Sequence, residues 1–211
     1  MAGNELRVGG LTPLTTIDYP GELAAVVFCQ GCPWRCCYCH NPELLPPRGE
    51  AAIPWKEVLA FLERRLGLLD AVVFSGGEPT LQPALGGAMD AVRGLGFKVG
   101  LHSAGIYPTR LARLLPRLDW VGLDVKALPE DYLALTGAEG SGKSAWESAR
   151  LLIDSGVSHE LRLTVHPALT AGQVEAIKTR LRAMGAQRVL EQPCREKGMF
   201  DPALSTATRQ S

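Results

Sequence analysis

Short apolar segments rich in β-branched residues alternate along this chain with segments that have a helical apolar period. Several of the apolar segments are hydrophobic at nearly every position, which is typical of parallel strands buried on both faces. They lie at 22–28, 70–74, 97–103, 120–127, 160–166 and 188–193. This pattern predicts six parallel strands.

A helix is predicted between each pair of consecutive strands. The first covers 54–69, where Pro54 opens the helix. One face of this helix carries Val58, Leu59, Leu62 and Leu66. The others cover 85–96, 107–118, 144–156 and 170–185. Such alternation of strands and helices implies a parallel sheet with right-handed crossovers.

Polar residues directly follow most of the predicted strands. In a (β/α) barrel the carboxyl ends of the strands build the active site, so this placement favours an incomplete barrel over a doubly wound sheet. We expect an α/β fold, a partial (β/α)6 TIM-like barrel with a parallel sheet, as a single domain over residues 1–211. Residues 1–21 then form an N-terminal extension, and the polar tail 205–211 is expected to fray.

The composition is that of an ordinary globular chain. Of the 211 residues 46% are hydrophobic and 21% are charged, and 22 basic residues balance 22 acidic ones. This balance argues against binding to nucleic acid or to an anionic membrane, and no apolar run is long enough to span a bilayer. The start of the chain does not combine a basic region with an apolar core, so we expect a cytoplasmic location. Clustered cysteines in a reducing compartment bind metal or do chemistry more often than they pair.

The segment FCQGCPWRCCYCHN, residues 28–41, holds five of the six cysteines. Two CxxC pairs are present, Cys29 with Cys32 and Cys36 with Cys39. They could bind zinc, although zinc-binding pairs usually lie farther apart than these do. Cys36, Cys39 and His40 also match the pattern for attachment of c-type haem, which is generally a chemistry of exported proteins. Disulfides or inert thiols are a third interpretation, which a reducing compartment disfavours.

Cys32, Cys36 and Cys39 have a CxxxCxxC spacing. Three thiolates on one short loop, expected at 28–42, can ligate three irons of a compact 4Fe–4S cluster. One iron is then left open, just as catalytic zinc sites keep one position free for substrate. This fourth interpretation favours a catalyst over an electron carrier.

CxxxCxxC at the end of the first strand of a (β/α) barrel resembles the radical S-adenosylmethionine enzymes. LTTIDYPG (14–21) and CHNPEL (39–44) resemble more narrowly the activating enzymes of glycyl-radical proteins, above all those of anaerobic ribonucleoside-triphosphate reductases. The resemblance extends from Thr15 to about Leu204. It implies a 4Fe–4S cluster and S-adenosylmethionine as cofactors, with the cysteines of the CxxxCxxC spacing as cluster ligands. Cys29 and Cys37 are then outside the ligand set.

The resemblance also implies where the cofactor binds. Tyr38, between two cluster ligands, is expected near the adenine, or it fills the loop. FSGGEPT (74–80) fits a tight turn when taken alone. The family binds the amino group of the methionine moiety at a GGE motif in this place, which implies contacts from Gly76, Gly77 and Glu78. Backbone carbonyls and a carboxylate are suitable acceptors for an ammonium group.

Two later strand ends carry further candidates. Asp124 and Lys126 are two residues apart and so project from the same face of a strand, either as a buried ion pair or as ligand-binding groups. The resemblance implies contacts with the carboxylate and ribose of the cofactor. Arg162 and His166 also share one face of their strand and could bind cofactor or a peptide substrate, although a structural role for His166 is equally compatible. Weaker candidates are His102, Ser103, Gln192 and Arg195, and Cys194 is expected to be a free thiol.

GAEGSGKS, residues 137–144, matches the phosphate-binding GxxxxGK[ST] pattern literally. That motif requires a buried strand leading into the loop, whereas the preceding PEDYLALT is acidic and begins with proline. We therefore expect a polar loop that opens a helix at Ser144, and not a nucleotide-hydrolysis site.

The resemblance implies an oxygen-sensitive enzyme that forms a 5′-deoxyadenosyl radical and installs a glycyl radical on a partner enzyme. We expect that partner to be an anaerobic ribonucleotide reductase and the electron donor to be flavodoxin or ferredoxin. Two alternatives remain open at this point. One is a radical enzyme that acts on a small molecule, such as a deazapurine synthase, and the other is a zinc-stabilised interaction module without catalysis.

Overall fold

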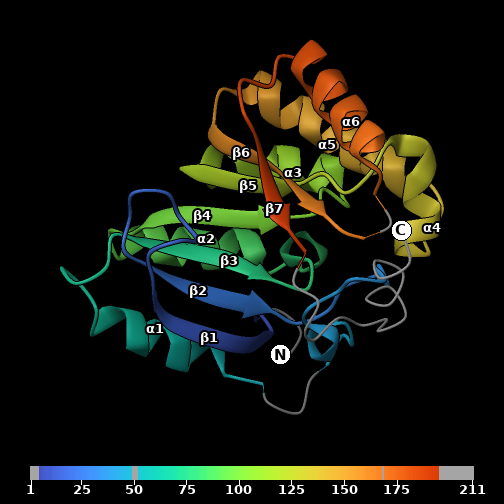
Figure 1. Cartoon of the computed structure of the whole chain (residues 1–211). Coiled ribbons are helices and arrows are strands. Elements are labelled where there is room, and N and C mark those ends of the chain that lie inside the picture. The colour runs from blue at the N-terminus through green and yellow to red at the C-terminus, as the bar shows by residue number, and fades with distance from the viewer. Residues whose placement is uncertain (1–4, 49–51, 168, 195–211) are drawn as a thin grey trace.

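A computed structural model describes residues 5–48, 52–167 and 169–194 (Figure 1). One seven-stranded sheet has the strand order β1-β2-β3-β4-β5-β6-β7. The strands are β1 (Val8–Thr15), β2 (Ala24–Cys29), β3 (Ala71–Gly76), β4 (Lys98–Ser103), β5 (Trp120–Asp124), β6 (Ser158–Val165) and β7 (Val189–Pro193). Strands β2 to β7 are parallel, which confirms the six predicted strands and the partial barrel.

The helices connect successive parallel strands and cover the outer face of the curved sheet (Figure 1). They are α1 (Trp55–Glu63), α2 (Leu85–Gly94), α3 (Pro108–Leu114), α4 (Tyr132–Thr136), α5 (Ser141–Ser155) and α6 (Ala171–Ala183). Short 3-10 helices add η1 (Pro42–Leu44), η2 (Pro79–Leu81), η3 (Leu115–Arg117) and η4 (Pro129–Asp131). The main hydrophobic core lies between the helices and the sheet, where the apolar side of each amphipathic helix meets strand side chains such as Val72, Leu101 and Leu161.

Strand β1 is the first difference from the predicted elements, because it lies inside the expected N-terminal extension. It pairs antiparallel with β2 and forms one edge of the sheet. Its sequence, VGGLTPLT, contains two glycines and a proline, which have low strand propensity. A proline is tolerated here because the strand is at an edge, where it need not donate to a second neighbour.

Helix α1 is the second difference, because it ends at Glu63 and not at residue 69. Val58 and Leu62 are fully buried as expected, whereas Leu66 is 52% exposed. The chain leaves the helix after Arg64 and reaches Gly67 with a φ of +74°, a conformation that glycine adopts without strain. Leu66 was therefore wrongly assigned to the buried face.

The residues before GAEGSGKS form η4 and α4, not a strand, so the phosphate-loop interpretation is excluded by context as expected. Helix α4 was not predicted, because five residues are too short to show a helical period. Helix α5 begins at Ser141, three residues before the predicted start, with Gly140 at its N-cap in the left-handed region.

A second, smaller hydrophobic cluster lies on the inner face of the sheet. It contains Tyr19, Ala24, Val26, Ala71, Val73 and Trp120. The ring centroids of Tyr19 and Trp120 are 5.2 Å apart, and a Cβ atom at Gly100 would lie 3.0 Å from the Tyr19 ring. The segment between β1 and β2 thus crosses the inner face and closes the floor of the open barrel.

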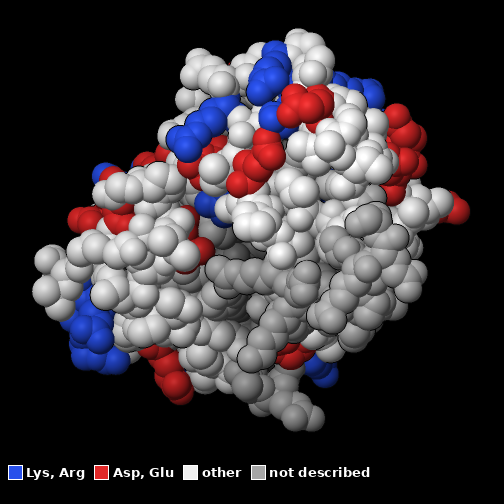
Figure 2. All heavy atoms as spheres, viewed as in Figure 1, with Lys and Arg blue, Asp and Glu red and all other residues white. Residues whose placement is uncertain are grey.

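No helix of the described part of the chain is long and apolar enough to cross a membrane. On the face seen in Figure 2, basic and acidic side chains are interspersed. Arg195 and the tail 205–211, for which we made predictions, lie outside the described residues.

Candidate active site

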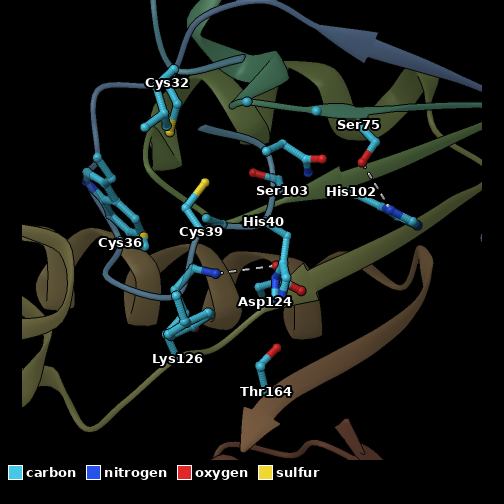
Figure 3. A pocket seen from close by; sticks show the side chains of 17 residues that line it. Cys32, Cys36, Cys39, His40, Ser75, His102, Ser103, Asp124, Lys126 and Thr164 are labelled. Atoms are coloured by element: carbon cyan, nitrogen blue, oxygen red, sulfur yellow. Dashed lines mark hydrogen bonds and ion pairs between the residues drawn. The ribbon is translucent and has the colours of Figure 1, made fainter. Parts of the chain in front are cut away.

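The cysteine loop begins where β2 ends, at the carboxyl edge of the parallel strands. Cys32, Cys36 and Cys39 line one cavity at this edge, and all three are partly buried (Figure 3). Cys29, the last residue of β2, is fully buried, and neither it nor Cys37 is among the residues that line the cavity. The loop thus brings together at the cavity the three cysteines of the CxxxCxxC spacing.

Hydrogen bonds hold the start of this loop against the CHNPEL segment that follows it. The N–H of Gly31 donates to the carbonyl of Leu44 at 2.8 Å. The buried side chain of Gln30 donates to the carbonyls of Glu43, at 3.0 Å, and Pro46, at 2.7 Å. The proline-led η1 therefore folds the end of the loop back onto its beginning, which fixes the path between the cysteines.

Two glycines at the end of β3 allow the sheet to approach the loop closely. Gly76 has a φ of +108°, and a Cβ atom there would lie 2.6 Å from the backbone nitrogen of Cys29. At Gly77 a Cβ atom would lie 2.4 Å from the carbonyl oxygen of Gly31. Both glycines line the cavity, as the sequence predicted, and no larger residue fits at either position without moving the backbone.

Glu78 is fully buried and is not among the residues that line the cavity. Its carboxylate accepts hydrogen bonds from the Thr80 N–H (3.1 Å) and hydroxyl (2.5 Å), the Ser103 hydroxyl (2.9 Å) and the Ala104 N–H (3.0 Å). Burial raises the pKa of Glu78, whereas these hydrogen bonds lower it. The carboxylate joins the ends of β3 and β4 through these hydrogen bonds, and the direct cofactor contact expected for Glu78 stays a prediction.

Asp124 and Lys126 both line the cavity and lie side by side, with Lys126 Nζ 3.5 Å from Asp124 Oδ2 (Figure 3). Burial alone would lower the pKa of Lys126, but the neighbouring Tyr38 and Asp124 raise it well above its usual value. The backbone N–H of Lys126 donates to the buried hydroxyl of Tyr132 at 2.8 Å. The site therefore holds a fixed cation beside a carboxylate that is only partly buried.

Tyr38 lines the cavity and stacks on His166, with ring centroids 4.9 Å apart and an interplanar angle of 22°. His166 itself is 4% exposed and lies behind Tyr38, not on the cavity wall. Within the described part of the chain, the buried Tyr38 hydroxyl and both buried ring nitrogens of His166 have no hydrogen-bond partner. Burial, with Lys126 nearby, lowers the pKa of His166 to about 4, so its ring is neutral at pH 7.

Arg162 lies on the inner face of β6 and, like His166, is not among the residues that line the cavity. Its guanidinium stacks over Trp120 at 5.0 Å, and its Nε lies 3.5 Å from Glu160. Gly122 leaves the room for it, since a Cβ atom there would lie 2.8 Å from the guanidinium carbon. The structure thus places Arg162 below the cavity, next to the floor of the barrel.

Other residues that line the cavity were only weak candidates from the sequence or were not predicted at all. His102 and Ser103, the weak candidates from β4, both line the cavity, whereas Gln192 and Cys194 are not among its lining residues. Also present are the unpredicted Trp34, Asn41, Ser75 and Thr164. The position of Ser75 directly before the two glycines was a signal that could have identified it.

The donor set of the cavity fits an iron–sulfur cluster. Burial raises the pKa of Cys32 to about 12 and also raises that of Cys36, so both thiols need a bound cation to lose their protons. No group of three or more His, Cys, Asp or Glu side chains in the described part of the chain could hold a single metal ion. In a 4Fe–4S cluster, by contrast, each thiolate binds its own iron, and three thiols around one cavity match that requirement.

The fold and this site define an α/β enzyme class, a partial barrel with a three-cysteine loop at the carboxyl edge of its sheet. Residues 26–181 match the Radical SAM superfamily, and the chain belongs to this superfamily. Its cofactors are a 4Fe–4S cluster and S-adenosylmethionine. The resemblance stated from the cysteine motif is therefore confirmed.

Within this superfamily, the chain is similar in sequence to proteins named as activating enzymes. A Methanocaldococcus jannaschii protein that carries the name of a glycyl-radical enzyme activating enzyme is 32% identical over 70% of this chain and 61% of its own length. The pyruvate formate-lyase-activating enzyme of Clostridium pasteurianum is 32% identical over 78% of this chain and 70% of its own. This chain thus spans less than two thirds of the first relative.

Among solved structures, Streptococcus suis SuiB bound to S-adenosylmethionine has a TM-score of 0.65 at 16% identity. The match covers 82% of this chain and 40% of SuiB, and at this identity it supports the fold alone.

Proposed function

We propose that this chain is an activating enzyme that installs a glycyl radical on a partner enzyme. One observation carries the proposal: Cys32, Cys36 and Cys39 face a single cavity that they share with Lys126 and Asp124. Three thiols leave one iron of a 4Fe–4S cluster without a protein ligand. Sequence similarity to two relatives named as activating enzymes supports the choice of reaction.

In this proposal the residues around the cavity bind and orient the cofactors. The three cysteines ligate the cluster, and the ammonium of Lys126 binds the carboxylate of S-adenosylmethionine as a point charge. Asp124, whose carboxylate is partly exposed, accepts hydrogen bonds from the ribose hydroxyls. Tyr38 packs on the adenine, and His166 supports Tyr38 from behind.

Gly76, Gly77 and Arg162 shape the cavity, whereas the residues above bind the cofactors directly. Gly76 and Gly77 let the cofactor approach the backbone at the end of β3. Arg162 lies below the cavity, where it supports the inner wall and is within reach of a peptide that enters the barrel. When bound, the cluster and S-adenosylmethionine supply the radical that removes hydrogen from a glycine Cα, and the protein's share is to orient the reactants and exclude water.

We further propose that the partner is an anaerobic ribonucleotide reductase and that flavodoxin or ferredoxin supplies the electron. The proposal of the partner is supported by LTTIDYPG and CHNPEL, which resemble the activating proteins of those reductases. Among the described strands β1 and β7 are the unpaired edges of the sheet, and we infer that a partner's loop reaches the cavity between them. We take residues 1–211 as one catalytic domain that works in the cytoplasm.

The first test is the ligand set, measured as iron and sulfide content after anaerobic reconstitution. Cys36→Ala should lose the 4Fe–4S cluster, because it removes one of three thiolates. Cys37→Ala is the matched control, since the neighbouring cysteine is not on the cavity wall, and it should keep the iron content of the unsubstituted protein. Equal loss of iron from both variants would contradict the ligand assignment.

The second test is the reaction. The reconstituted protein, a one-electron reductant and S-adenosylmethionine should yield 5′-deoxyadenosine and, with an anaerobic ribonucleotide reductase, a glycyl-radical doublet in the electron paramagnetic resonance spectrum. A partner with its radical glycine replaced by alanine is the control. A doublet on pyruvate formate-lyase alone would correct the partner, and cofactor cleavage without any protein radical would favour a small-molecule substrate.

A further inference from the structure

Helix α4 lies behind the cavity and contacts two of its parts, the cysteine loop and Lys126. Its residues Tyr132, Leu135 and Thr136 are buried, and none of them is among the residues that line the cavity. The helix was not predicted from the sequence and has no role in the function proposed above. Its hydrogen bonds show which groups it holds in place.

The carboxyl end of α4 holds the cysteine loop on both sides of Cys36. The carbonyl of Thr136 accepts a hydrogen bond from the Arg35 N–H at 2.9 Å. The carbonyl of Leu135 accepts from the Cys37 N–H at 3.1 Å. The last carbonyls of a helix have no partner within the helix, and here the N–H groups of the loop satisfy them. Cys36, which lines the cavity, therefore lies between two anchored neighbours.

Tyr132, at the start of α4, connects the same loop to Lys126. Tyr132 is fully buried, and its ring meets that of Trp34 edge-on, with centroids 5.8 Å apart. Its hydroxyl accepts from the Lys126 N–H at 2.8 Å. Strand β5 ends at Asp124, so Lys126 lies beyond the strand, and the Tyr132 hydroxyl takes the place of a ladder acceptor. One side chain thus fixes the backbone of Lys126 against the cysteine loop.

Helix α4 is itself fixed on α5 by residues of the GAEGSGKS segment. A Cβ atom at Gly142 would overlap the carbonyl group of Pro129 in η4, so only glycine allows η4 to pack on α5 this closely. The hydroxyl of Thr136 lies 2.9 Å from that of Ser141. These contacts limit the movement of α4, and they give a glycine of the rejected phosphate-binding pattern a structural role.

Cys36 and Lys126 line the same cavity, and α4 holds the backbone on both sides of Cys36 as well as that of Lys126 (Figure 3). In the proposed function the cluster and the Lys126 ammonium contact one cofactor molecule, so their separation decides whether it can reach both. We propose that α4 is a positioning element of this site and that Tyr132 is the positioning residue that sets Lys126 relative to the cysteine loop. The inference rests on the proposed function for the role of Lys126.

The test compares two affinities of the reconstituted protein, for S-adenosylmethionine and for its decarboxylated analogue, by anaerobic equilibrium dialysis. Their ratio isolates the contribution of the carboxylate and, measured on one sample, is independent of the folded fraction. Lys126→Met removes the ammonium and gives the ratio expected without its contact. Tyr107→Phe is the matched control, because Tyr107 is not among the residues that line the cavity, and it should keep the ratio.

Tyr132→Phe keeps the ring against Trp34 but removes the acceptor of the Lys126 N–H. The N–H must then move to find another partner, which displaces the ammonium. We expect the ratio to fall by about threefold to tenfold, the range that one hydrogen bond contributes, while the iron and sulfide content stays unchanged. An unchanged ratio would overturn the proposal, because a merely structural role changes both affinities equally.

A double variant tests whether Tyr132 acts through Lys126. Effects that act through one residue are not additive, so adding Tyr132→Phe to Lys126→Met should leave the ratio of the single Lys126→Met variant unchanged. A further fall would overturn the proposal. Tyr132→Ala also removes the ring from Trp34 and should lose iron in addition. Equal iron loss in Tyr132→Phe would overturn the proposal too, because the hydroxyl would then support the loop and not Lys126.

These outcomes separate the inference from the proposed function. An unchanged ratio in Lys126→Met would refute the proposed cofactor contact and the inference with it. An unchanged ratio in Tyr132→Phe alone would refute the inference and leave the proposed function standing. A protein that shows the expected ratios but installs no glycyl radical refutes the proposed reaction and leaves the positioning role of Tyr132 intact.

Discussion

Replacing Gly77 with alanine tests how the cysteine loop is held against the sheet. The new Cβ atom would lie 2.4 Å from Gly31 O and 3.0 Å from Leu44 O, whereas ordinary contacts begin at 3.4 Å. Both of these atoms belong to backbone, so the loop itself must move by about 1 Å to relieve the overlap. That movement strains the hydrogen bonds from Glu78 N–H to Gly31 O (2.9 Å) and from Gly31 N–H to Leu44 O (2.8 Å).

The expected cost combines overpacking with two weakened hydrogen bonds, about 2–4 kcal/mol of the free energy of unfolding. Urea unfolding measures this loss, and iron content after anaerobic reconstitution reports whether the cysteines still reach the cluster. We expect Gly77→Ala to lose most of its iron, because Cys32 directly follows the displaced Gly31.

Gly87→Ala is the matched control. Gly87 lies within α2, and a Cβ atom there meets nothing within 4 Å, so this variant should gain about 0.5–1 kcal/mol and keep its iron. The reasoning is refuted if Gly77→Ala unfolds within about 0.5 kcal/mol of the unsubstituted protein and binds the same iron.

Three further predictions follow from other contacts. Tyr132→Phe leaves the buried N–H of Lys126 without its acceptor and should cost about 1–3 kcal/mol in urea unfolding; an unchanged midpoint would contradict this. His102 has a pKa of about 4 when folded and an ordinary value of 6.5, so the unfolded chain binds more protons between these values. Stability should therefore fall as the pH drops from 6.5 to 4, and the share of His102 in this fall is about 3 kcal/mol. His102→Asn should remove that share from unfolding curves measured across the range, while the share of His166, whose pKa is also lowered to about 4, remains. Thr170→Ala removes the capping box of α6, in which Gln173 N–H donates to the Thr170 hydroxyl, and should lower the melting temperature by the equivalent of about 1 kcal/mol, whereas Thr170→Ser should not.

The parallel part of the fold could be predicted from the sequence because buried strands and amphipathic helices each impose a local period. All six parallel strands and one helix between each consecutive pair were found in this way. Strand β1 and helix α4 were not found, since VGGLTPLT lacks strand-forming residues and α4 has only five residues. Their stability comes from pairing with β2 and from burial of Tyr132, which are tertiary effects.

The candidate site, like the fold, could be predicted from the sequence only in part. The cysteine spacing lies within one loop, so the sequence alone was enough to propose a three-thiol set and to group Asp124 with Lys126. The predicted common strand face for these two residues is wrong, because β5 ends at Asp124. The side of the wall on which Glu78 lies was not predictable, because it depends on donors from Thr80, Ser103 and Ala104 that only the folded ends of β3 and β4 bring together.

The sequence by itself determined the class of fold, because this is encoded in local periods. It indicated the cofactor chemistry through a short cysteine motif that resembles a known family. Only the tertiary structure decided which distant groups meet around the cavity. The Asp18 carbonyl and the His102 ring are 84 positions apart in the chain, and their contact exists because the segment after β1 folds across the inner face of the sheet. Contacts between such distant positions exist only in the folded chain, and for that reason local sequence does not determine them.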